Sequence, residues 1–480
     1  MRTDRRPNVM LYTTDQHRGD HLGMAGHPLC ETPNFDAMCR HGAYFRNAYS
    51  EIPSTTGARR CMLRGQGSYD CGLVGYSSVE WSEADSLAAV LAANGYHCIN
   101  VGWRNLYPQR KLYGFHRVVC HELYPGVDDY WEWLCEQAGP DAFERGHGGD
   151  ANGWSARPWH LEDRLHPTVW TTDVALEEIR KSDPTRPVFI WISQHRPHSP
   201  YDPPQHFWDM YAECELPDPP LGDWAKKHDI PGPGLPLDAW RGRLTPAQSR
   251  RIRAAYMGSI THLDCEFGRL KQHIAWYLNK LRPDFPEWLT VMTSDHGDMM
   301  GDHCLYRKTY AYEGSARIPF LVQYPKSLDL LSGTFEHPVG LQDVMPSILD
   351  AVGVDIPDAV TGQSVFDAID GKPWRAFMHG EHSPCYSEAE AMHYLTDGKE
   401  KFIYFPATGE RQCFDLQADP QELNNLASDA TYAERVAVWE QRLIEKLAAR
   451  DDGFSDGTRL LRRDNWAAEV EKNAVQREPK

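Results

Sequence analysis

The chain has 480 residues, with 50 Lys and Arg against 68 Asp and Glu, and a formal net charge of −18 at pH 7. Hydrophobic residues make up 41% and charged residues 25%, the balance of an ordinary soluble globular protein. This acidic balance excludes a protein that coats nucleic acid, because clustered Lys and Arg dominate binding to a phosphate backbone.

Apolar, β-rich runs alternate with helix-length segments along most of the chain. The runs lack polar alternation, as is typical of strands covered on both faces in a parallel sheet. They are 9–14, 97–102, 188–192, 289–293 and 320–324. The helical segments are 34–41, 86–94, 170–182, 246–281 and 341–352. This alternation predicts an α/β fold with a large, mostly parallel sheet sandwiched by helices.

The character of the chain changes after residue 372. Two strand-like runs, 394–399 and 402–405, are joined by a turn, and an amphipathic helix follows at 432–449. We therefore expect a catalytic domain of residues 1–372. Residues 373–480 are predicted to form a small α+β C-terminal subdomain with a small sheet, a helix and a tail.

Polar and charged residues follow the ends of several predicted strands, where α/β sheets build their sites. Asp15 and Gln16 follow the first strand, and residues 195–198 and 293–298 follow two others. Each cluster alone is common in turns and helix caps, but their joint occurrence favours a site. Carboxylates combined with imidazole suit one divalent ion such as Mn²⁺ or Zn²⁺, whereas Ca²⁺ prefers shells made only of oxygen.

Several motifs together resemble the sulfatase branch of the alkaline phosphatase superfamily. They are Pro7 to Gln16, the hydroxyl-bearing loop that ends in Arg59 and Gly65, Arg196 to Pro200, Tyr256 to Asp264, Ser294 to His303, Lys308 with Tyr312 to Pro319, Phe414 to Leu416, and Asp419 to Leu426. The resemblance implies an alkaline phosphatase-like fold and a metal-dependent ester hydrolase. Within that branch, the pairs 15–16 and 295–296 are more similar to phosphonate monoester hydrolases and phosphodiesterases than to arylsulfatases.

The chain departs from the family at the nucleophile. Family members carry a Cys that becomes formylglycine, at a fixed spacing before an Arg and a Gly. Anchoring on Arg59 and Gly65 puts Thr55 at that position, so the formylglycine route is closed. A metal-bound Thr55 hydroxyl can still attack phosphorus or sulfur. Ser54 and Thr56 are the weaker candidates for the nucleophile.

The resemblance also implies roles for the other residues. Asp15, Asp295 and His296 would bind the metal together with Thr55. Arg59 would hold the nucleophile and the anionic oxygens, because its planar guanidinium suits oxyanions.

The leaving group and the substrate have candidate partners of their own. His198 and Lys308 would bind substrate oxygens or protonate the leaving group. Substrate binding would further involve Gln16, Asn105 and His303.

A second departure lies at residues 101–106, which read VGWRNL. Sulfatases usually have Gly-Lys-Trp-His-Leu there, and the Lys and His contact the sulfate. Trp103 and Asn105 stand at the two positions in this chain. Either Arg104 takes over the missing charge or the substrate group differs.

These observations predict a metal-dependent hydrolase of phosphodiesters or phosphonate monoesters with a small anionic substrate. Phosphoenzyme hydrolysis has precedent in the superfamily, and a threonine adduct requires such a step. The alternative is a sulfatase that works without formylglycine, and the second alternative is a non-catalytic, ligand-binding descendant of the fold.

The cellular setting follows from composition. The 12 scattered cysteines form no C-x-x-C pair, and no signal peptide or membrane span is evident. We expect a cytoplasmic protein that binds neither nucleic acid nor a membrane. Association into a homo-oligomer stays open.

Overall fold

An eight-stranded sheet lies at the centre of the computed structural model, which describes residues 6–124, 126–232 and 234–470. The strands follow the order β5-β4-β6-β1-β7-β8-β2-β9. Their bounds are β1 (Asn8–Asp15), β2 (Gly42–Phe45), β4 (His97–Gly102), β5 (Arg117–Cys120), β6 (Val188–Pro197), β7 (Trp288–Ser294), β8 (Phe320–Gln323) and β9 (Gly333–Phe335). The strands from β5 to β7 pair in parallel, and β8 pairs antiparallel with both β7 and β2. The predicted, mostly parallel α/β sheet is thereby confirmed.

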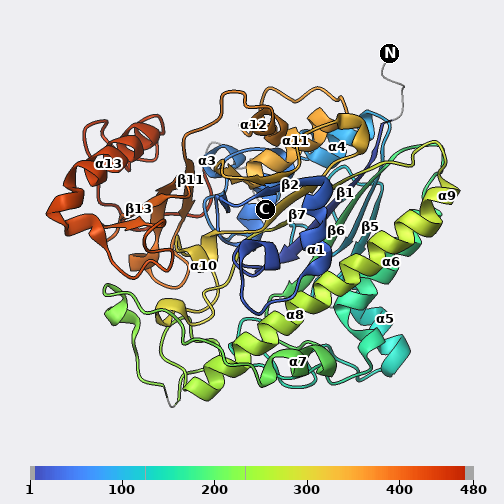
Figure 1. The fold of residues 1–480 in the computed structure, drawn as a ribbon, viewed down its shortest axis with the longest axis horizontal. Helices are drawn as coiled ribbons and strands as arrows, with labels where there is room; N and C mark the ends of the chain where they lie inside the picture. The colour runs from blue at the N-terminus through green and yellow to red at the C-terminus, as the bar shows by residue number, and fades with distance from the viewer. Residues whose placement is uncertain (1–5, 125, 233, 471–480) are drawn as a thin grey trace, which may run out of the picture.

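The two faces of this sheet explain its apolar strands. Successive side chains of β1 point to opposite faces, so Val9 and Leu11 enter one core while Met10 and Tyr12 enter the other. The first core contains residues of α2 (Thr55–Arg64), α4 (Leu87–Ala93) and α11 (Val344–Ala351). The second contains residues of α1 (Pro33–Met38), α6 (Pro167–Lys181) and α8 (Pro246–His273). Figure 1 shows α4 and α11 on one side of the sheet and α6 and α8 on the other.

The remaining elements are short or peripheral. They are β3 (Ala48–Tyr49), α3 (Ser68–Cys71), α5 (Asp129–Ala138), α7 (Gln205–Ala212), α9 (Asn279–Leu281), α10 (Glu313–Ala316), β10 (Val339–Gly340) and α12 (Val365–Ile369). The segment predicted as one helix over 246–281 is helical throughout but not uniform. It is α-helical up to His273, π-helical over Ile274–Leu278, and α-helical again in α9. No helix in the described part of the chain combines the length and hydropathy that a membrane crossing requires.

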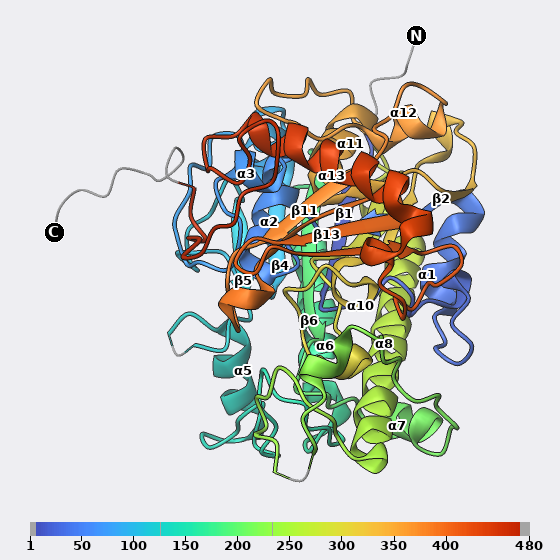
Figure 2. The ribbon, with the colours of Figure 1, turned by 90° about the vertical axis from the view of Figure 1, so that its left-hand side faces the viewer.

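A four-stranded antiparallel sheet forms the C-terminal subdomain. It consists of β11 (Met378–His382), β12 (Met392–Thr396), β13 (Glu400–Phe405) and β14 (Glu410–Asp415). The helix α13 (Ala433–Ala448) lies over this sheet (Figure 2). Its Trp439, Leu443 and Leu447 share a hydrophobic core with residues of the sheet. The boundary at residue 372 stays a prediction, and the last ten residues of the predicted tail lie outside the described residues.

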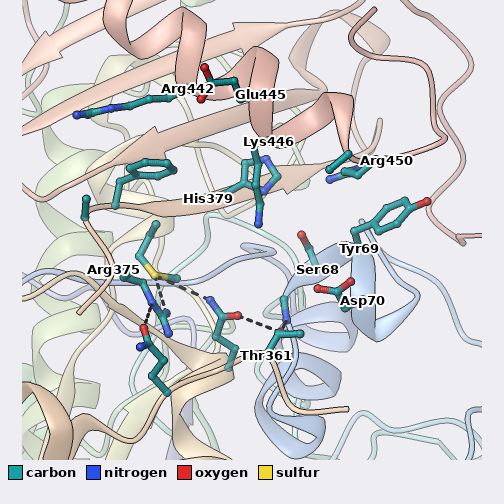
Figure 3. Close-up of a pocket in the computed structure, with 17 residues that line it drawn as sticks. Ser68, Tyr69, Asp70, Thr361, Arg375, His379, Arg442, Glu445, Lys446 and Arg450 are labelled. Carbon is teal, nitrogen blue, oxygen red and sulfur yellow. Dashed lines mark hydrogen bonds between the residues drawn. The ribbon is translucent and has the colours of Figure 1, made fainter. Parts of the chain in front are cut away.

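A cavity of about 720 Å³ lies at the seam between the subdomain and the catalytic domain. Figure 3 shows Lys446 projecting from α13 toward it, with Arg375 on the opposite wall. Two of its cations are already paired, because Arg375 contacts Asp343 and Arg450 contacts Glu381. The first pair connects the two walls of the seam, whereas Arg450 and Glu381 both belong to the subdomain.

A buried ion network crosses the same seam. The ammonium of Lys401, on β13, donates to Glu313 of α10 and to Glu422, at 2.8 Å each. Lys401 is fully buried, so its charge depends on these two carboxylates for stabilisation.

We predict that Lys401→Met lowers the free energy of unfolding by about 3 kcal/mol, because buried Glu422 would lose its cation while Glu313 would keep only its contact with Arg317, at 3.6 Å. Urea denaturation at pH 8 measures this loss. The matched control is Lys399→Met, which replaces an exposed lysine beside the same strand and should change stability by less than about 0.5 kcal/mol. Equal stability of the two variants would contradict the prediction.

Candidate active site

Two neighbouring strands bring the three predicted metal ligands together. Asp15 ends β1, while Asp295 and His296 directly follow β7, which pairs in parallel with β1. The carboxyl ends of the two strands therefore meet at one edge of the sheet. The ligand atoms of the three residues lie within 4.8 Å of one another, and all three residues are buried.

The donor atoms of this group fit a divalent cation. Asp15 Oδ1 is buried and has no hydrogen-bond partner among the described residues, which is costly unless a cation faces it. Burial, together with the charge of Asp295, raises the pKa of Asp15 to about 7. Burial lowers the pKa of His296 to about 3, so its ring is neutral. The Nδ1–H of His296 donates to Gly297 O at 2.9 Å, which leaves Nε2 free to bind a metal.

Thr55 is the hydroxyl residue that the structure brings to this group. Its Oγ1 lies 3.2 Å from His296 Nε2 and 3.5 Å from Asp15 Oδ2. Thr55 is also the first residue of α2, where the helix dipole and unpaired N–H groups favour negative charge. The hydroxyl of Thr56 instead accepts from the Ser77 N–H at 3.4 Å, and the buried Ser54 Oγ has no partner in the described structure.

Arg59 lies one helical turn after Thr55 and contacts the metal ligands themselves. Its Nη2 donates to Asp15 Oδ2 at 3.1 Å and its Nε to Asp295 Oδ2 at 3.2 Å. Its Nη1 donates to Ser193 Oγ at 2.7 Å. All three guanidinium nitrogens are thus engaged, so Arg59 holds the two carboxylates in place. Its predicted contact with substrate oxygens stays a prediction.

Lys308 and His198 form a pair beside Thr55. Lys308 Nζ lies 2.8 Å from His198 Nε2, 3.5 Å from Thr55 Oγ1 and 3.4 Å from Gln16 Oε1. The Nδ1–H of His198 donates to Ser199 O, so its Nε2 accepts from the ammonium. Burial and the charge of Lys308 hold the pKa of His198 well below its usual value. Burial lowers the pKa of Lys308, and the charges of Asp15 and Asp295 oppose this lowering. Lys308 is the hydrogen-bond donor of the pair and lies next to Thr55.

The structure does not bring the other predicted residues to this group through its described contacts. His303 packs against Trp224, with ring centres 4.7 Å apart, and its Nδ1 accepts from the Gly222 N–H. Asn105 donates its backbone N–H to Glu122 Oε1 at 3.1 Å. Arg104 is fully buried and donates to two backbone carbonyls at 2.8 Å each, so it does not supply the charge missing from this segment.

Asp298 is a supporting residue whose part the sequence did not reveal, although it stands inside the motif at 294–298. Its Oδ2 accepts from Gln16 Nε2 and from the Tyr201 hydroxyl, at 2.5 Å each. Its Oδ1 accepts two backbone N–H groups, of Met300 and Arg307. Asp298 therefore fixes the amide of Gln16 toward Lys308.

Glu122 provides a test of burial at the edge of the site. It is 1% exposed, and burial raises its pKa from 4.5 to about 7, so the folded protein holds this proton more tightly than the unfolded chain. Wild type should therefore lose stability as the pH rises from 4.5 through 7. In Glu122→Gln, the decrease in the free energy of unfolding over this pH range should be smaller than in wild type by up to about 3 kcal/mol. Urea denaturation at pH 5 and pH 8 checks it, with the exposed Glu83→Gln as control. Parallel behaviour of Glu122→Gln and wild type would refute it.

Comparisons with known proteins identify the family of the chain. Residues 7–354 match the family described as Sulfatase, and residues 301–449 match the C-terminal region of N-sulphoglucosamine sulphohydrolase. The chain is 39% identical to an arylsulfatase of Clostridium perfringens, over 95% of this chain and 98% of the relative. It is 26% identical to a choline-sulfatase of Rhizobium meliloti, over 89% and 83%.

The solved structure of a phosphonate monoester hydrolase from Agrobacterium radiobacter is similar in fold. The TM-score is 0.75 and the match covers 99% of this chain and 100% of the other, at 22% identity. Such a likeness supports the fold and not the activity. The predicted closeness to phosphonate monoester hydrolases is therefore limited to structure, whereas the sequence is similar to an arylsulfatase. The chain belongs to the sulfatase family of the alkaline phosphatase superfamily and is an ester hydrolase of that family.

Proposed function

We propose that the protein hydrolyses sulfate esters with Thr55 as the nucleophile. The observation that carries this proposal is the position of Thr55 Oγ1, 3.2 Å from His296 Nε2 and 3.5 Å from Lys308 Nζ. A hydroxyl between a cation site and an ammonium is well placed to lose its proton and attack. The 39% identity to an arylsulfatase supports sulfate over the phosphorus esters that the sequence motifs favoured.

The charges around Thr55 support a substrate with one negative charge. The carboxylates of Asp15 and Asp295 are balanced by the cations of Arg59 and Lys308. A divalent cation then adds two positive charges, which an ionised Thr55 and a monoanionic ester neutralise. Sulfate esters carry one charge, whereas phosphate monoesters carry up to two, so the site should disfavour phosphate monoesters.

The reaction has two displacement steps. Thr55 first releases its hydroxyl proton to solvent. Its Oγ1 then attacks sulfur, the bond from sulfur to the leaving oxygen breaks, and Lys308 gives its proton to that oxygen. Water then attacks the sulfur of the threonyl sulfate, and its two protons go to Thr55 Oγ1 and to Lys308, which releases the sulfate dianion and restores both groups. His198 keeps Lys308 in reach by accepting from it at 2.8 Å. A divalent cation, when bound by Asp15, Asp295 and His296, supplies Lewis acidity and favours the ionised hydroxyl.

The nucleophile is tested with three variants assayed on 4-nitrophenyl sulfate in the presence of Mn²⁺. We expect Thr55→Ala to lower kcat by about 1,000-fold or more, as removal of other enzyme nucleophiles does. Thr55→Ser keeps a hydroxyl and should retain much of the activity. The control Thr56→Ala changes the neighbouring hydroxyl, which points to Ser77. Turnover of Thr55→Ala at the wild-type rate would overturn the assignment. Mass spectrometry of acid-quenched wild type should find an added SO₃ group on the peptide with Thr55.

A phosphodiester or phosphonate monoester hydrolase is the second candidate. Thr55 itself favours it, because a threonine adduct, unlike a formylglycine hydrate, leaves only by attack on sulfur or phosphorus. The kcat/KM values for 4-nitrophenyl sulfate, bis(4-nitrophenyl) phosphate and 4-nitrophenyl phosphate separate the candidates, each measured with Mn²⁺, Zn²⁺ and Ca²⁺. We expect the sulfate to rank first and the phosphate monoester last. A higher value for the diester would favour the second candidate, and no turnover with any metal would favour the non-catalytic alternative.

A further inference from the structure

Trp103 touches the candidate metal site through both its side chain and its backbone. It follows β4 directly and is 7% exposed. Its indole Nε1–H donates to Asp15 Oδ2 at 2.6 Å. Its backbone N–H donates to Ser193 O at 2.7 Å, and its backbone carbonyl accepts from Arg59 Nη1. One residue thus joins β4, β6, a metal ligand and the arginine that supports that ligand.

The backbone before Trp103 is shaped for this close approach. Gly102 has a φ of 99°, which side chains other than glycine rarely adopt. A Cβ built on Gly102 would lie 2.1 Å from Ser193 O, the acceptor of the Trp103 N–H. The end of β4 can therefore bring the indole to Asp15 only with glycine at this position.

Ring stacking holds the indole in its orientation. The Trp103 ring stacks on His195, with centroids 4.3 Å apart and planes at 29°. His195 is buried, accepts from Arg196 Nη1 at 2.7 Å, and stacks in turn on His198. Such stacking fixes an aromatic ring beyond the effect of burial alone. The direction of the indole N–H is thus set by neighbours that do not touch the cation site.

The two oxygens of Asp15 are used in different ways. Oδ2 accepts from the indole of Trp103, from Arg59 Nη2 at 3.1 Å and from the Thr55 hydroxyl at 3.5 Å. Oδ1 is buried without a hydrogen-bond partner among the described residues. The N–H donors therefore occupy one oxygen and leave the other for a cation. The donor closest to Oδ2 is the neutral indole, which orients the carboxylate without placing another positive charge beside the cation.

We propose that Trp103 is a positioning residue for the metal site, whose indole N–H turns the Asp15 carboxylate so that Oδ1 alone faces the cation. Trp103 acts through Asp15 and does not itself contact the substrate or the cation. The role concerns metal affinity, so it holds whichever ester the enzyme cleaves. Partners of this kind, bound to a metal ligand and not to the metal, typically contribute about 10-fold to 100-fold in metal affinity.

The test is the Mn²⁺ affinity of Trp103→Phe, measured by isothermal titration calorimetry on metal-free, full-length protein without substrate. Phenylalanine keeps a ring on His195 and removes the N–H. We expect the Kd for Mn²⁺ to rise about 10-fold to 100-fold. Trp103→Leu, which also lacks the N–H, should weaken binding as well. It provides a second measurement if Trp103→Phe does not fold, and circular dichroism and the Tm establish that each titrated variant is folded.

A matched control separates the N–H from a general loss of indole. Trp439→Phe removes a similarly buried indole, whose Nε1 donates to Glu400 Oε2 at 2.9 Å in the C-terminal subdomain. Its Kd for Mn²⁺ should equal that of wild type. An unchanged Kd in folded Trp103→Phe, or an equal weakening in Trp439→Phe, would overturn the proposal. Failure of sulfate hydrolysis in wild type would leave these Kd values readable, so the two proposals fail separately.

Discussion

The burial of two carboxylates side by side is the constraint on which the rest of this structure depends. Asp15 and Asp295 lie at the ends of neighbouring strands with almost no exposure to water. Like charges in such a place repel strongly, and burial adds a desolvation cost to each. Burial and the charge of Asp295 therefore raise the pKa of Asp15. A divalent cation relieves this repulsion, and the surrounding residues supply the remaining compensation.

Several elements of the fold place the groups that stabilise the two carboxylates. The carboxyl ends of β1 and β7 provide the ligands, and the N-terminus of α2 brings Thr55 and, one turn later, Arg59. A segment after β7 returns with Lys308, which lies between Thr55 and His198. Positive groups therefore reach the carboxylates from the helix and from the loop, while the sheet holds the carboxylates still. Thr55, the proposed nucleophile, lies where these contributions meet.

The C-terminal subdomain borders this site as well as completing the fold. His382, the last residue of β11, has its pKa lowered to about 4 mainly by burial, and the charge of Lys308 acts on it. The buried network of Lys401, Glu313 and Glu422 ties the same subdomain to α10. The subdomain thus contacts α10, which follows Lys308 closely in the chain.

Much of this architecture follows from the sequence alone. The central strands and the helices that cover them were predictable, because long apolar runs in a globular protein are usually buried in its core. Spacing was equally informative for the proposed nucleophile, since Arg59 and Gly65 single out Thr55. The residues Asp15, Asp295, His296, His198 and Lys308, predicted from motifs, lie together in the structure. Short strands such as β5 and β9 escaped prediction, because a few partly exposed residues carry no periodic signal.

Only the tertiary structure decided what the side chains of the segment after β4 do. From the sequence, Arg104 could have replaced a missing charge, but it turns inward to backbone carbonyls. Trp103 looked like the loss of a cation, whereas its N–H reaches a carboxylate 88 positions away. His303 stands within a predicted motif and yet packs against Trp224. In each case the direction of the side chain is set by contacts with residues distant in the chain, and no local spacing encodes them.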